Sequence, residues 1–243
     1  MYNMRYIKTS ERLNLLKDVA NENGWSTDVI GQTKNGLDLF VFRNRLDKRV
    51  DLCAWSLMHG NEPTGFNALL SLMQRPNTSI SWSIFPVVNP NGADLFKRLN
   101  ADALDINRDA RNLNSIEGLA LSKWVLGENP SLALNLHDQR SIYSVSNKKN
   151  PSILSFLSPS ADSIKSETRS RVISMKIIAS ISEKLSTLIP DCFSRYNDDH
   201  NKNCVGDTFQ SLGTPTILFE SGHYQNDYQR ENTRKYMCFA LIS

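Results

Sequence analysis

A short run of metal-binding residue types is the part of this sequence best suited to chemistry. His59-Gly60-Asn61-Glu62 has the pattern H-x-x-E at the end of an apolar stretch, and His137 follows further along, in Asn135-Leu136-His137-Asp138. Two imidazoles and one carboxylate leave the fourth position around a zinc ion open, which is typical of catalytic zinc. Zinc in such a site lowers the pKa of a bound water from about 16 toward about 7. We therefore expect one Zn²⁺ ion, held by His59, Glu62 and His137, and hydrolysis of an amide or related acyl bond.

The elements that must position these residues alternate along the chain. Apolar periodicity and turn residues predict helices over residues 10–23, 63–73, 115–126 and 165–188 and from residue 227 onward, and strands over 37–43, 50–58, 80–88, 132–136 and 216–219. Ser10 and Ser115 are the expected N-caps of the first and third helices. This order predicts a single α/β domain over residues 1–243, with a mixed, mostly parallel twisted sheet and helices on both faces.

The candidate residues fall at the ends of the predicted strands. His59 follows strand 50–58, His137 follows strand 132–136, and Glu220 follows strand 216–219. In open α/β sheets, ligands bind beyond the carboxyl ends of the strands. The three residues are therefore expected to converge on one site.

The composition argues against several classes of partner. The chain has 243 residues and a formal net charge of +3, which is too small to favour nucleic acid or an acidic membrane surface. No apolar stretch approaches the roughly 18 residues of a membrane span, and residues 1–6 lack the apolar region of a signal peptide. The four cysteines are widely spaced and predict reduced thiols, although a Cys192–Cys204 bridge stays open. We expect a cytoplasmic protein.

Further motifs follow the H-x-x-E pattern in a characteristic order. Asn89-Pro90-Asn91-Gly92 precedes Arg98-Leu99-Asn100, then Asp105-Ile106-Asn107-Arg108, and Phe219-Glu220 comes last. With the candidate zinc ligands, this ordered set resembles the zinc metallocarboxypeptidases of the carboxypeptidase A type, over about residues 55–223. The resemblance implies the fold of that family and a peptidase that removes C-terminal residues.

The resemblance also implies roles around the metal. His59, Glu62 and His137 match the zinc ligands of the family. Asp105 matches an acid that orients a ligand histidine, and such a bond fixes the imidazole tautomer. Glu220 matches the general base, which takes a proton from water and passes it to the leaving amine.

Other positions match residues that contact the substrate. The resemblance implies that Asn107 and Arg108 bind the terminal carboxylate, a task that suits the planar guanidinium fork. Arg98 matches the arginine that stabilises the oxyanion. Tyr196 is the nearest candidate for a tyrosine that closes over the substrate, and Gly206 falls where the floor of the specificity pocket is expected, as a residue that leaves space.

Two other functions remain open. Deacylases of the aspartoacylase and succinylglutamate desuccinylase type share the H-G-N-E and D-x-N-R motifs and cleave N-acyl amino acids, which also carry a free carboxylate. The Asn89–Gly92 loop, the ending Phe219-Glu220-Ser221-Gly222-His223 and the short segment after it favour a peptidase. The third possibility is a catalytically inactive peptide-binding homologue, against which the presence of every ligand and the base argues.

Overall fold

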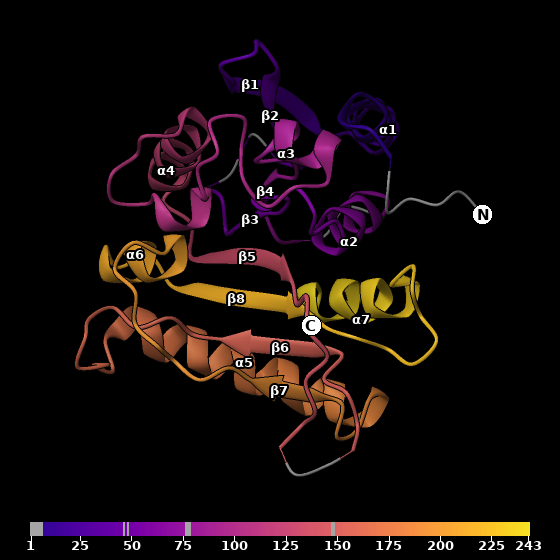
Figure 1. Cartoon of the computed structure of the whole chain (residues 1–243), viewed down its shortest axis with the longest axis vertical. Coiled ribbons are helices and arrows are strands. Elements are labelled where there is room, and N and C mark those ends of the chain that lie inside the picture. Colours follow the sequence, from indigo (N-terminus) through magenta and orange to yellow (C-terminus); the bar gives the residue numbers. More distant parts are fainter. Residues whose placement is uncertain (1–6, 46, 48, 76–78, 147–148) are drawn as a thin grey trace.

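A twisted eight-stranded sheet forms the centre of the computed structural model, which describes residues 7–45, 47, 49–75, 79–146 and 149–243 (Figure 1). Residues 1–6, in which no signal peptide was expected, lie outside these ranges. The strands follow the spatial order β1-β2-β4-β3-β5-β8-β6-β7. Their bounds are β1 Ser26–Gln32, β2 Asp38–Arg43, β3 Leu52–Trp55, β4 Trp82–Phe85, β5 Leu132–Asp138, β6 Leu154–Leu157, β7 Phe193–Arg195 and β8 Thr216–Ser221. The helices are α1 Thr9–Asn23, α2 Thr64–Met73, α3 Pro90–Leu95, α4 Ile116–Glu128, α5 Arg169–Leu188, α6 Val205–Ser211 and α7 Glu231–Leu241, with a 3₁₀ turn at Ile106–Arg108.

The sheet is parallel at its centre and mixed at its edges. Strands β4, β3, β5 and β8 run parallel to one another, whereas β2 joins β4 and β6 joins β8 in the antiparallel sense. Every residue of β5 is buried, as expected for a parallel strand covered on both faces. The predicted fold class, an α/β domain with a mixed sheet and helices on both faces, is confirmed.

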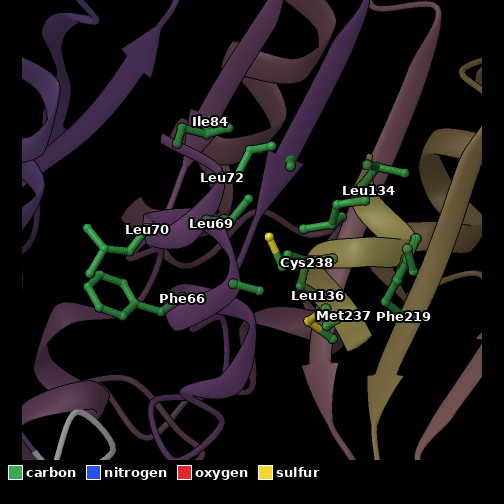
Figure 2. Packing of buried hydrophobic residues seen from close by; sticks show 14 of the residues in the cluster. Phe66, Leu69, Leu70, Leu72, Ile84, Leu134, Leu136, Phe219, Met237 and Cys238 are labelled. Carbon is green, nitrogen blue, oxygen red and sulfur yellow. The ribbon is translucent and has the colours of Figure 1, made fainter. Parts of the chain in front are cut away.

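Two apolar layers cover the two faces. One contains Leu134 and Leu136 of β5 together with residues of α1, α2, α5 and α7. Figure 2 shows part of this layer, in which Met237 and Cys238 of α7 lie beside Leu136 of β5, while Phe66 and Leu70 of α2 point away from that strand. The other contains Ala133 of β5 and residues of α4 and α6. Because side chains alternate along a strand, His137 shares the face of Ala133.

Several elements are not those that the sequence predicted. The Asn89–Gly92 segment, expected as a loop, begins α3: the Asn89 side chain accepts the Gly92 N–H at 2.8 Å, and Pro90 occupies the first turn. Strands β1, β6 and β7 and helix α6 were not predicted. The Ser10 cap is wrong, since Lys8 precedes α1 without a side-chain bond, whereas Ser115 caps α4 as predicted.

The strand boundaries also differ from prediction. Strands β3 and β4 are shorter at both ends than the predicted ranges 50–58 and 80–88. Residues 56–58 and 86–88 belong to the loops that follow these strands. Strands β5 and β8 are longer, so that His137 and Glu220 lie within them rather than after them. All four cysteines are free thiols. None of the helices in the described ranges combines the length and apolar character needed to cross a bilayer.

Candidate metal centre and active site

The three predicted metal ligands lie together. His59 and Glu62 belong to the loop between β3 and α2, and His137 lies near the carboxyl end of β5. Since β3 and β5 are neighbouring parallel strands, these ends meet at the same edge of the sheet. All three side chains are buried, and their ligand atoms lie within 4.8 Å of one another.

The distances within this cluster fit a metal ion. His59 Nδ1 lies 2.9 Å from Glu62 Oε1, His137 Nδ1 lies 2.8 Å from Glu62 Oε2, and the two Nδ1 atoms are 3.2 Å apart. Bonds of about 2.0–2.1 Å in a tetrahedral site place ligand atoms roughly 3.3 Å apart. Two ring nitrogens this close cannot both carry a proton, but both can face a cation. The donor set is therefore one that zinc accepts.

The charges in the cluster agree with this arrangement. Burial alone would raise the pKa of Glu62, but the close contacts with the imidazoles of His137 and His59 hold it well below its usual range, so the carboxylate is ionised. Burial lowers the pKa of His137, which favours the neutral imidazole that binds a metal. A buried anion beside a neutral imidazole is the state that a divalent cation requires.

Asp105 fixes the orientation of His59. Its Oδ1 lies 3.1 Å from His59 Nε2 and accepts the Asn107 N–H at 3.0 Å, while its Oδ2 accepts from Arg98 Nε at 3.0 Å. Burial alone would raise the pKa of Asp105, but the bond to His59 and the charge of Arg98 hold it well below its usual range. The ionised carboxylate favours the tautomer in which Nε2 carries the proton, so that Nδ1 presents its lone pair to the cluster.

Removing Asp105 should weaken metal binding without emptying the site. We expect Asp105→Ala to lower zinc affinity by about 10- to 100-fold, because His59 would lose its orienting partner. Competition with a chromogenic chelator measures this affinity. Asp102→Ala is the matched control, since Asp102 lies in the same loop but pairs with Lys34 on the surface. Equal affinities for the two variants would contradict the orienting role.

Gly60, between the ligands His59 and Glu62, lies against the start of α3. A Cβ at Gly60 would lie 1.9 Å from the Gly92 carbonyl carbon and 2.2 Å from Ala93 N. These are backbone atoms of a capped helix, so they have little room to shift. The packing of α3 therefore fixes the path of the loop that carries two ligands.

Gly60→Ala should destabilise the fold and distort the metal loop. We expect the free energy of unfolding to fall by about 1–3 kcal/mol, as for other overpacked sites, and zinc affinity to fall with it. Chemical denaturation with and without zinc measures both effects. Gly127→Ala is the control: a Cβ there meets nothing within 4 Å, so the α4 substitution should stabilise by about 0.5–1 kcal/mol. A Gly60→Ala protein as stable as wild type would contradict this packing argument.

Glu220 lies beside His137 on the neighbouring strand. The register of β5 and β8 pairs His137 with Glu220, and both residues line the same cavity. Burial raises the pKa of Glu220 well above its usual value, and the negative charges of Glu62 and Asp138 raise it further. A carboxyl group whose pKa lies nearer neutrality can both accept and return a proton.

The predicted substrate-binding residues line this cavity, which has a volume of about 360 Å³. Arg98 pairs with Asp105 at 2.9 Å, and its Nη1 lies 3.3 Å from His59 Nδ1. Arg108 Nη1 donates to Asn107 O at 3.2 Å and to Cys204 Sγ at 3.1 Å. Among the described residues no carboxylate pairs with Arg108, so its charge is available to a ligand.

The structure corrects the interpretation of Gly206. Gly206 lines the cavity, as predicted, but a Cβ at this position would lie 2.9 Å from Pro159 Cγ. Pro159 therefore occupies the space that the missing side chain was expected to open. Tyr196 also lines the cavity, and its ring meets that of Tyr143 edge to face at 6.3 Å.

Sequence reasoning missed a buried support beneath the cluster. The Asp138 N–H donates to Glu62 Oε2 at 3.2 Å, and Asp138 Oδ2 accepts from the Thr64 hydroxyl at 2.8 Å and lies 3.5 Å from Arg230 Nη1. Burial raises the pKa of Asp138 to about 6. These contacts join β5, α2 and the segment before α7 around Glu62, a candidate metal ligand. The position of Asp138 directly after His137 was the only sign in the sequence that this residue supports the cluster.

No protein-family model and no curated protein matches the sequence. Solved structures do match. Carboxypeptidase A from Helicoverpa armigera has a TM-score of 0.77 at 14% identity, covering 100% of this chain and 73% of the other. A metallo-carboxypeptidase from Burkholderia cenocepacia has a TM-score of 0.70 at 13% identity, covering 96% and 68%.

A third match is the metallo-carboxypeptidase from Pseudomonas aeruginosa in complex with (2-guanidinoethylmercapto)succinic acid, with a TM-score of 0.71 at 15% identity, covering 96% and 68%. This chain covers 66% of the putative carboxypeptidase A from Shewanella denitrificans. It therefore spans about two thirds of the length of several of these neighbours. The chain has the metallocarboxypeptidase fold, which confirms the resemblance drawn from the motifs.

Proposed function

We propose that this protein is a zinc-dependent metallocarboxypeptidase that hydrolyses the C-terminal peptide bond of a peptide. One observation carries the proposal: a single cavity is lined by the cluster of His59, Glu62 and His137 and also by Glu220 and Arg108. The three clustered side chains would hold the zinc ion. When bound, such an ion lowers the pKa of water and polarises a carbonyl group.

The remaining residues would bind the substrate and move protons. Arg108 and Asn107 would receive the terminal carboxylate, since the guanidinium can donate two parallel bonds to its oxygens. Arg98, beside His59, would donate to the carbonyl oxygen as negative charge develops on it. Glu220 would accept a proton from the attacking water and return it to the leaving amine, a role that its raised pKa favours.

One fold neighbour supports a substrate with a carboxylate. The Pseudomonas aeruginosa structure holds a succinic acid derivative, a ligand with carboxylates. A cavity with an arginine that lacks a carboxylate partner among the described residues agrees with a ligand of this kind.

Mass spectrometry of peptide digests tests the proposal. The zinc-loaded protein is incubated with peptides that have a free C-terminus, with the same peptides as C-terminal amides, and with N-acyl amino acids. We expect release of one C-terminal residue from the free acids, and slower release from the amides by roughly 10- to 100-fold, because the bond to Arg108 is lost. Turnover of only the N-acyl amino acids would instead identify a deacylase. No turnover of any substrate would favour the inactive peptide-binding homologue.

A further inference from the structure

One arginine of the cavity wall has no role in the proposed reaction. Of the arginines around the metal cluster, Arg98 pairs with Asp105 and Arg230 lies 3.5 Å from Asp138. Arg108 and Arg140 both line the cavity, and neither pairs with a carboxylate in the part of the chain that the structure describes. The proposed function uses Arg108. It leaves Arg140 as a second cation that pairs with no carboxylate of the described residues.

Arg140 is held at the rim beside the metal loop. Its Nη1 donates to the carbonyl oxygen of Asn61, between the ligands His59 and Glu62, at 3.0 Å. The backbone before it is fixed, since Gln139 N donates to Ser221 O at 2.7 Å and Gln139 O accepts from Arg230 Nη2 at 2.7 Å. A guanidinium has five N–H groups. The bond to Asn61 uses one and leaves the others for a ligand in the cavity.

A second hollow adjoins the cavity at Tyr143. Tyr143 lines both the cavity and this neighbouring hollow, whose other walls include His223 and Gln225. Asp199 connects the cavity to a different hollow, lined by Arg111 and Lys202 and lying next to Cys204, the partner of Arg108. If Arg108 holds the terminal carboxylate and the scissile bond lies at the metal cluster, the amino side of the peptide would lie by the metal loop, which Arg140 contacts at Asn61.

We propose that Arg140 binds an acidic side chain on the amino side of the scissile bond, so that the preferred substrates are peptides with Asp or Glu at the penultimate position. This inference rests on the proposed function. A carboxylate there would pair with the free N–H groups of a planar fork. Because Arg140 is exposed, solvent screens the pair, and we expect a preference of roughly three- to tenfold over a neutral side chain.

A matched pair of substrates measures this preference. N-acetylated tripeptides with Glu or Gln at the penultimate position, and with varied C-terminal residues, differ by one charge at nearly constant shape. We expect wild-type kcat/KM to favour Glu by roughly three- to tenfold, and added salt to reduce the ratio. Arg140→Gln should bring the ratio close to one, and Arg140→Lys should restore part of it. Arg111→Gln is the control, because Arg111 lies outside the cavity and donates to Lys202 O; it should keep the wild-type ratio.

A binding measurement separates this inference from the proposed function. The same peptides with a D-amino acid at the C-terminus resist hydrolysis and are titrated calorimetrically into wild type and Arg140→Gln. Hydrolysis with equal rates for Glu and Gln peptides would overturn the role of Arg140 and leave the peptidase intact. A preference for Glu in binding, lost in Arg140→Gln but without hydrolysis of L-peptides, would support Arg140 and overturn the peptidase. Neither hydrolysis nor a binding preference would overturn both.

Discussion

Replacing His137 by alanine should empty the metal centre and abolish peptide hydrolysis. His137 Nδ1 faces both Glu62 and His59, so its loss leaves a two-ligand site with one open side. We expect zinc content to fall from about one ion per chain to near zero. Activity should fall by more than the roughly 10- to 100-fold typical of a residue that only supports a ligand. Metal analysis after dialysis and the peptide assay measure the two effects.

His223→Ala is the control for this substitution. His223 is another imidazole near the same edge of the sheet, but it lines the neighbouring hollow rather than the cavity. We expect it to keep its zinc. Circular dichroism of both variants establishes that they are folded. A folded His137→Ala protein that keeps one tightly bound zinc and wild-type activity would contradict the assignment of the cluster.

Replacing Glu220 by glutamine should separate metal binding from catalysis. The amide has the shape of the carboxyl group but cannot accept the proton, so we expect kcat to fall by about 10²- to 10⁴-fold. KM and zinc content should change little, because Glu220 is not one of the clustered ligands. The change also removes a half-buried carboxyl group whose ionisation two neighbouring carboxylates oppose, so the variant should be at least as stable as wild type.

Steady-state kinetics and metal analysis of Glu220→Gln test this separation. Glu183→Gln, an exposed glutamate of α5, is the control and should keep full activity. Full activity in Glu220→Gln with zinc retained would show that another group accepts the proton. Loss of zinc in this variant would assign Glu220 to the metal rather than to proton transfer.

The metal cluster could be predicted because its signals are local. His59 and Glu62 are separated by two residues, and each candidate lies at the end of an apolar run that reads as a buried strand. Strand ends meet in a predictable place in an α/β sheet. The pairing of His137 with Glu220 needed the register of β5 and β8, which no local pattern encodes.

The parts that could not be predicted depend on contacts between distant segments. Strands β6 and β7 are short strands at one end of the sheet, where β6 pairs with β8 and β7 pairs with β6. The Pro159 contact that fills the space at Gly206 is likewise invisible in the sequence. Arg140 has no motif, because its position depends on the Asn61 carbonyl across the loop.

Crystals of the protein with zinc and a peptide product, measured on both sides of the zinc absorption edge, test the central claim most directly. We predict a single anomalous peak bonded to His59 Nδ1, Glu62 and His137 Nδ1 at about 2.0–2.2 Å, with the product carboxylate on Asn107 and Arg108. A zinc peak bonded to other side chains, or a product carboxylate away from Arg108, would contradict it.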